Sequence, residues 1–196
     1  MRYSAEHKQK TRERVLRETA REVRAKGPGG VAVAGLMARA GLTHGGFYAH
    51  FPSKDALVAE AVDVMFADAR ARAAALDSAN DPRAALRDYV RFYLSPAHRD
   101  GRDRGCPLPA LAGDIARSPG AAGARFADGI SGLAARLADL LARAGVEQAD
   151  AEGNALLAQL VGAVSLARAL GKGAASDTML RDTCARICAR YGLSQA

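Results

Sequence analysis

Several residue types are scarce in this sequence of 196 residues, which has no tryptophan, five phenylalanines, five tyrosines and three cysteines. Cys106, Cys184 and Cys188 are too few for a disulfide scaffold, and their spacing matches no zinc-binding pattern, so we expect no metal site. No apolar run approaches the roughly 20 residues that span a bilayer, and the first 26 residues are too charged for a signal peptide. We therefore expect a cytoplasmic protein that does not associate with membranes.

An excess of either charge is absent from residues 55–196, which contain 17 basic and 17 acidic side chains. The net charge of +7 comes from residues 1–54, where eleven Lys and Arg accompany four Glu. These charges alternate with apolar residues at helical spacing, so we expect them on a folded surface rather than on a tail. A cationic surface confined to one part of a chain is typical of nucleic-acid binding.

β-Branched residues are also sparse, whereas alanine, leucine and arginine dominate, and this composition favours helix nearly everywhere. The pattern predicts an all-α protein of about nine helices. The segment 96–105, PAHRDGRDRG, is polar and contains glycine, so we expect an exposed loop there. The predicted helices cover residues 6–26, 33–39, 44–50, 53–75, 82–95, 107–116, 121–143, 148–170 and 176–190.

Two short helices around Gly41 form a predicted helix-turn-helix. Thr43 is placed to cap the second of them, and Gly41 permits a tight turn. Gly45 and Gly46 are poor helix formers, so their presence suggests that the backbone approaches another surface closely, such as DNA. The residues spaced to pack the two helices together are Leu36, Ala40, Leu42 and Phe47.

Residues 33–57, VAGLMARAGLTHGGFYAHFPSKDAL, resemble the DNA-binding signature of TetR/AcrR-family transcriptional regulators. The A-G-L-T turn, the glycine pair, F-Y-x-H-F and S-K-D-x-L occur in order and without gaps. The resemblance covers about residues 8–66, and the remainder is similar only in length and helical pattern. Two positions depart from the family pattern. Ala32 replaces the usual Ser or Thr cap, which weakens the helix start by roughly 1 kcal/mol, and Met37 replaces a small alanine.

The resemblance implies an N-terminal three-helix DNA-binding domain over residues 1–54 and a helical effector-sensing and dimerisation domain over residues 55–196. It also implies that the recognition helix runs from Thr43 to His50. His44 is then the candidate for base contact beside Gly45 and Gly46, although it is otherwise a solvated surface histidine. Tyr48 alternatively bonds within the protein, and His50 alternatively braces the next helix. The residues expected to contact phosphates are Thr43, Tyr48, His50 and Lys54.

The predicted partners are an operator in double-stranded DNA, a second copy of the chain and an unidentified small-molecule effector. One helix-turn-helix makes few contacts, so a specific site usually requires two copies. The resemblance places the dimer contact on the helices at about 148–170 and 176–190. The first of these is apolar around much of its circumference, which suits a dimer core or a monomer core.

The resemblance implies an effector site between the helices of the second domain, and the residues that could line it are also ordinary core residues. Cys106 follows Arg102 and Arg104 at a helix start, where cations and the helix dipole favour a reactive thiolate, so an oxidant or electrophile sensor is the alternative. Cys184 and Cys188 are expected to pack at an interface or in the core. The candidate lining residues are Tyr89, Phe92, Tyr93, Leu108, Leu111, Phe126 and Leu133.

A cysteine-dependent enzyme is the alternative from another class. Of the four histidines, His7, His44 and His50 belong to the basic segment and His98 lies in the expected loop. No Ser-His-Asp arrangement, phosphate-binding glycine loop or metal-spaced ligand set occurs. We therefore expect no catalytic residues and no cofactor.

Overall fold

The computed structural model describes residues 2–73, 80–117 and 120–193, and for residues 2–5, 44 and 73 it describes the backbone only. Every regular element in these ranges is a helix, as the composition predicts. The elements are α1 (Arg2–Lys26), α2 (Val33–Arg39), the 3-10 helix η1 (His44–Ala49), α3 (Lys54–Ala73), α4 (Pro82–Tyr93), α5 (Pro96–Asp100), α6 (Leu108–Ala116), α7 (Ala121–Arg143), α8 (Ala149–Leu170) and α9 (Ala174–Arg190).

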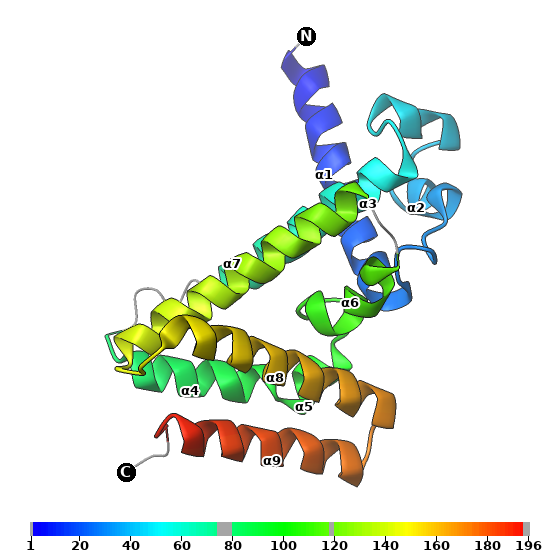
Figure 1. Ribbon diagram of the computed structural model, residues 1–196. Helices are drawn as coiled ribbons and strands as arrows, with labels where there is room; N and C mark the ends of the chain where they lie inside the picture. The colour runs from blue at the N-terminus through cyan, green and yellow to red at the C-terminus, as the bar shows by residue number, and fades with distance from the viewer. Residues whose placement is uncertain (1, 74–79, 118–119, 194–196) are drawn as a thin grey trace.

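The helices form two clusters joined by a long pair (Figure 1). At one end α1 and α2 pack with η1, and at the other end α8 packs between α7 and α9, with α4 beside them. The long helices α3 and α7 run together between the clusters, and α1 packs on α3. Gly129 of α7 lies against the ring of Phe66, where an added Cβ would meet ring carbons at 2.4 Å. This close approach is why α3 and α7 can pack over much of their length.

The predicted apolar stripe of the first helix is buried, because its residues recur every three or four positions and face α2 and α3. Two expectations near the N-terminus are corrected. The first helix begins at Arg2 rather than at residue 6. The third element is a short 3-10 helix rather than an α-helix, since Gly45 and Gly46 disfavour α-helix and the backbone N–H of Gly46 bonds back to Thr43. The buried stripe comprises Val15, Leu16, Thr19, Ala20 and Val23.

The expected exposed loop at residues 96–105 is only partly correct, because residues 101–105 are turns with Arg102 and Arg104 exposed, whereas residues 96–100 are not a loop. Residues 96–100 form helix α5, which Ser95 caps by accepting a hydrogen bond from the backbone N–H of His98 at 3.1 Å. His98 and Arg99 are both buried. The Arg99 guanidinium bonds to Ser176 and Asp177, which are distant in sequence, and the His98 ring bonds to backbone groups of Tyr93 and Cys106. Burial with satisfied polar groups is why the local polarity of the segment was misleading.

The expectation that no segment could span a membrane also needs correction. Among the described residues α8 has the length and apolar composition of a membrane span. It also carries Asp150, Glu152 and Arg168, and one side of it packs against α7 and α9. Core helices of soluble proteins have the same properties, so the match is weak evidence for a membrane segment.

Candidate nucleic-acid interface and ligand cavity

The turn between α2 and η1 is built from short-range contacts. Gly41 has φ +71°, a conformation that residues with a Cβ rarely adopt, and the backbone N–H of Leu42 donates to the carbonyl of Met37 at 2.8 Å. Thr43 caps η1, because its Oγ1 accepts a hydrogen bond from Gly46 at 3.3 Å. Ala32 makes no side-chain cap at the start of α2, as the sequence predicts. The turn is therefore fixed mainly by local bonds, to which Arg14 of α1 adds a longer one by donating to the Ala40 carbonyl.

The aromatic residues of η1 and the residues after it divide between the core and the surface. Phe47 and Phe51 are buried with ring centroids 5.8 Å apart. Tyr48 is 67% exposed and touches only the edge of the Phe47 ring among its aromatic neighbours. The alternative in which Tyr48 is half-buried and bonded within the protein therefore does not describe this structure. The Tyr48 hydroxyl is available to a partner.

The glycine pair lies on the same surface as Tyr48 and is not explained by packing within the protein. A Cβ added at Gly45 would meet nothing within 4 Å, and one added at Gly46 would meet only Thr43 Oγ1, at 3.6 Å. Neither glycine has a positive φ, unlike Gly41. The fold thus leaves room for alanine at both positions. His44 begins η1, and its side chain lies outside the described part of the structure.

His50 and Lys54 are both half-buried, unlike the exposed Tyr48. The Nδ1 of His50 is buried without a hydrogen-bond partner among the described residues. Burial lowers the pKa of His50, and the charges of Lys8 and Arg12 lower it further. Lys54 donates to the carbonyl of Gly29 at 3.4 Å. In this structure Lys54 therefore braces the turn after α1.

Fewer cations of residues 1–54 are free to contact a partner than the net charge of this segment suggests. Arg24 is 3% exposed and pairs with Asp68 at 2.9 Å. Arg12 pairs with Glu60 of α3 at 2.5 Å and also lies over the ring of Phe51. The exposed cations without an ion pair in the described structure include Lys8 and Lys10, in the N-terminal half of α1. The positive charge that remains for a partner therefore includes this end of α1.

A cavity of about 290 Å³ lies between the end of α3, α4 and the segment from α5 to Cys106. Of the predicted lining residues, Tyr89, Phe92 and Tyr93 line it together with Cys106. The others are buried in the core outside this lining, namely Leu108, Leu111, Phe126 and Leu133. The lining residues that the sequence did not indicate are Ala69, Arg72, Ala97, His98, Gly101, Arg104 and Gly105.

His98 joins the two sides of this cavity. Its Nδ1 lies 2.7 Å from the Tyr93 carbonyl oxygen, and the backbone N–H of Cys106 donates to its Nε2 at 3.0 Å. Because a carbonyl only accepts and an N–H only donates, both bonds require the neutral ring with hydrogen on Nδ1. Burial lowers the pKa of His98, which the bond to the Tyr93 carbonyl partly offsets. Sequence reasoning missed this role because the partner groups are backbone atoms.

Burial in this conformation opposes the reactive thiolate that the sequence suggests at Cys106. The side chain is 6% exposed, and burial raises the pKa of the thiol. The nearby Tyr93 hydroxyl and the charges of Arg168 and Arg24 offset only part of this effect. These two arginines, rather than Arg102 and Arg104, are the cations that act on the thiol, because the fold brings α1 and α8 toward it.

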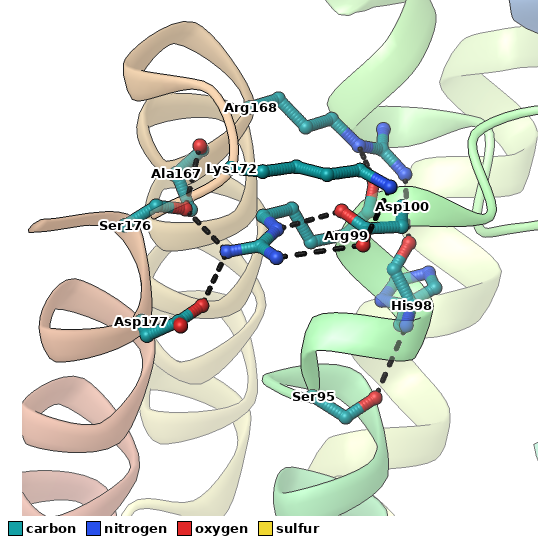
Figure 2. A network of polar contacts seen from close by, with 9 residues as sticks. All are labelled: Ser95, His98, Arg99, Asp100, Ala167, Arg168, Lys172, Ser176 and Asp177. Carbon is teal, nitrogen blue, oxygen red and sulfur yellow. Dashed lines mark hydrogen bonds and ion pairs between the residues drawn. The ribbon is translucent and has the colours of Figure 1, made fainter. Parts of the chain in front are cut away.

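A polar network fastens α5 to α8 and α9 (Figure 2). Arg99 donates to Ser176 Oγ at 2.7 Å and to Asp177 at 2.6 Å. Arg168 of α8 donates to the carbonyls of His98 and Arg99 at 3.1 and 3.0 Å. Lys172 and Arg99 both pair with Asp100. The cavity wall and the last two helices therefore form one hydrogen-bonded unit.

Small residues and two leucines occupy the side of α8 that faces away from its neighbours in the chain. Leu166 and Leu170 are both more than half exposed, and a Cβ added at Gly162 would meet nothing within 4 Å. The predicted core of this helix is buried on the opposite side, at Leu156, Leu157, Leu160 and Val164, whereas Val161 is half-buried. Cys184 and Cys188 are half-buried against the core. The exposed or half-buried residues of this side are Ala151, Ala158, Gly162, Leu166, Ala169 and Leu170.

Comparisons with known proteins agree with this arrangement. Residues 15–61 match the profile of bacterial regulatory proteins of the tetR family. A TetR transcriptional regulator from Chloroflexus aurantiacus J-10-FL superposes with a TM-score of 0.82 at 26% identity, over 95% of this chain and 96% of that one. A TetR-family regulator from Agrobacterium tumefaciens gives 0.77 at 24% identity, over 91% and 98%. The reduced form of E. coli NemR gives 0.80 at 21% identity, over 91% and 95%. No curated protein sequence matches the chain.

Proposed function

This chain belongs to the TetR family of transcriptional regulators, and we propose that it is a homodimeric repressor released from a palindromic operator by a small molecule. In this proposal residues 1–54 read DNA, and residues 55–196 bind the effector and hold the two copies together. The observation that carries the proposal is the exposed surface of η1, where Tyr48 and two glycines without a packing role lie together. The family's regulators bind DNA as their function, so no catalytic role is assigned.

The contacts proposed with DNA follow from exposure. Thr43 and Tyr48 carry exposed hydroxyls that suit phosphate contact, and the backbone at Gly45 and Gly46 can sit against the groove. His44 is proposed for base contact by its position at the start of η1. His50 and Lys54 are half-buried, and Lys54 already donates to the Gly29 carbonyl, so we give them a supporting role in phosphate contact.

The first experiment is fluorescence anisotropy with the protein's own upstream DNA and a scrambled duplex, over a series of salt concentrations. We expect nanomolar binding that prefers the upstream sequence and weakens as salt rises. Tyr48→Ala should weaken this binding at least tenfold, whereas Ile130→Ala, which removes an exposed apolar side chain from α7, should not change it. Equal and weak binding to both duplexes, repeated with DNA selected from a random pool, would contradict the proposal.

Pairing of two copies is proposed on the open side of α8 together with α9. Gly162 offers space for close approach, and the exposed Leu166 and Leu170 would lose contact with water. Gly162→Glu should leave the protomer folded but yield monomers in sedimentation analysis. Gly132→Glu is the matched control, because this exposed glycine on α7 also has open space around its Cα. If the Gly162→Glu variant remained a dimer, the interface could not include this side of α8.

The effector site is proposed in the cavity lined by Tyr89, Phe92 and Tyr93. A ligand there need only prefer the conformation that binds DNA poorly, since a differential affinity shifts the equilibrium between conformations. Because α5 forms one wall and is bonded to α8 and α9, a ligand that moved α5 would also act on the proposed dimer helices.

A second candidate mechanism has Cys106 as a sensor of oxidants or electrophiles. It is favoured by the position of the thiol in the wall of this cavity, although burial raises the pKa of the thiol and so slows any reaction in the conformation described. The test is release of operator DNA by an alkylating reagent or peroxide in the wild-type protein and in Cys106→Ser. A normal response in Cys106→Ser would contradict the sensor mechanism and leave the small-molecule mechanism intact.

A further inference from the structure

A second cavity, of about 410 Å³, lies between the C-terminal end of α1, helix α6 and helix α8. It shares no lining residue with the cavity lined by Tyr89, Phe92 and Tyr93, which we call the aromatic cavity. In Figure 1 α6 lies between the lower end of α1 and the α8 layer. This cavity therefore borders both the DNA-binding head and the helices proposed for pairing. Its lining is mostly polar, and the charged and hydroxyl residues in it are Arg24, Lys26, Arg102, Asp114, Ser165 and Arg168.

Two of these cations have no acidic partner among the described residues. Arg168 donates only to the carbonyls of His98 and Arg99, and its remaining nitrogen, Nη1, is buried without a hydrogen-bond partner. Figure 2 shows this nitrogen on the side of the guanidinium away from the α5 carbonyls. Arg102 is exposed, and no ion pair involves its side chain. Burial lowers the pKa of Arg168, and the charge of Arg102 lowers it further.

The other charged residues of the cavity are balanced by partners. Lys26 pairs with Glu22 at 3.1 Å, and Arg24 pairs with Asp68 at 2.9 Å. Asp114, the only acidic residue in the lining, is paired with Arg117 at 2.8 Å. Arg102 and Arg168 are thus left as two like charges that repel each other at the edge of a partly buried cavity. The partly buried Arg168 charge is costly without an acidic partner, and an anion beside its guanidinium group and that of Arg102 would reduce that cost.

We propose that this cavity binds a small phosphate-bearing anion between Arg102 and Arg168. A guanidinium presents several N–H donors in a plane and so matches the oxygens of a phosphate group. The cavity is larger than a phosphate group alone, so it also has room for a small polar body attached to that group. The Ser165 side chain adds a hydroxyl to the same wall.

Binding at this site would connect the head to the second domain. Arg102 belongs to the segment after α5, Arg168 belongs to α8, and α1 closes the third side. The same segment already touches α1 through the Arg24 guanidinium, which lies 3.5 Å from the Asp103 carbonyl oxygen. An anion that neutralised Arg102 and Arg168 would hold the segment after α5, which touches α1, against α8, and so restrict the position of the head. Occupancy should therefore change operator affinity in addition to stability.

The test compares thermal unfolding and calorimetric titration of the full-length protein in inorganic phosphate and in chloride at equal ionic strength. We expect phosphate to raise the Tm of the wild-type protein by about 3–6 °C near saturation. Arg102→Gln should weaken phosphate binding at least tenfold. Arg104→Gln is the matched control, because Arg104 is also an exposed neighbour but lines the aromatic cavity instead. Its phosphate response should equal that of the wild type.

A charge reversal gives an independent readout. Arg102→Glu supplies the missing acidic partner of Arg168, so this variant should have a higher Tm than the wild type in chloride and no response to phosphate. An equal response of the wild type to phosphate and chloride would overturn the proposal, and so would a full response in Arg102→Gln. None of these measurements depends on operator binding. The anion site can therefore be confirmed or contradicted independently of the proposed repressor function.

The source of the phosphate group is distinguished by titrating three probes. Inorganic phosphate and glycerol 3-phosphate represent the free ion and a phosphate monoester, and tighter binding of the ester would identify a metabolite. A short duplex without operator sequence is the third probe. If the duplex bound through Arg102 and both small phosphates did not, the cavity would be part of the DNA surface and the proposal would be wrong.

Discussion

The helix-turn-helix of residues 33–51 and the segment of residues 95–106 are similar in being short and rich in polar or glycine residues, but they are held in different ways. In the first, most of the bonds that fix the backbone span few residues, from Met37 to Leu42 and from Thr43 to Gly46, and Arg14 adds one longer bond to the Ala40 carbonyl. In the second, they come from Arg168, and from Arg99 to Ser176, about seventy or more residues away. Local contacts can be recognised in a sequence, whereas long-range contacts form only in the fold.

The largest expected effect tests whether the glycine pair serves a partner rather than the fold. Gly45→Ala adds a methyl group in open space, so the Tm should change little. If backbone sits against DNA at this point, operator affinity should fall roughly 100-fold, or about 2.7 kcal/mol. Anisotropy titration and thermal unfolding measure the two quantities. Gly132→Ala on α7 is the control, and unchanged affinity in Gly45→Ala would show that DNA does not approach there.

The next effect tests how strongly the segment 95–106 depends on distant residues. Arg99→Ala removes buried hydrogen bonds to Ser176 and Asp177 and should lower the free energy of unfolding by about 2 kcal/mol. Urea denaturation gives this value. Arg104→Ala, in which an exposed ion pair with Asp103 is lost, should change stability by less than about 0.5 kcal/mol. Equal losses in the two variants would mean that the network adds nothing to stability.

A pH series tests the His98 bridge within the same segment. Burial and the charges of Arg168 and Arg72 keep the pKa of His98 in the folded protein below its ordinary value. The unfolded chain therefore takes up a proton first as pH falls below about 6.5, and folding is opposed by up to about 1.4 kcal/mol per pH unit. Above that pH the ring is neutral in both states, so this contribution is constant. As the pH is lowered from 8 to 5, the Tm should fall more steeply for the wild type than for His98→Gln. Parallel curves of Tm against pH for the two proteins would refute the His98 bridge.

The smallest expected effect tests the helix-turn-helix of residues 33–51, where most of the backbone bonds are local. Ala32 stands at the N-cap of α2 in extended conformation without a capping bond. Ala32→Ser supplies the missing acceptor and should raise the free energy of unfolding by roughly 0.5–1 kcal/mol. Ala34→Ser, inside α2, is the control and should not stabilise the protein. A cap that stabilises α2 would show that this part of the head responds to local chemistry alone.

Prediction from sequence succeeded where a residue acts through its own backbone or a near neighbour. The boundaries of α2 and α7, the cap at Thr43 and the buried stripe of α1 follow from side-chain type and spacing. The aromatic side of the cavity was also indicated, because Tyr89, Phe92 and Tyr93 share one helix. The remaining predicted lining residues are apolar side chains that are buried in the core instead, because apolar character alone does not distinguish a cavity wall from a core.

The sequence by itself determined the helical class, the position of the turn at Gly41 and the match of residues 15–61 to the tetR-family profile, because these depend on local propensity and on the order of a short motif. Only the tertiary structure decided that Arg24 is buried, that residues 96–100 are a helix, and that the Cys106 thiol is shielded. It also decided that Arg102 and Arg168 line one cavity. Charge is local in a sequence, but its burial and its partners depend on which distant helices pack together.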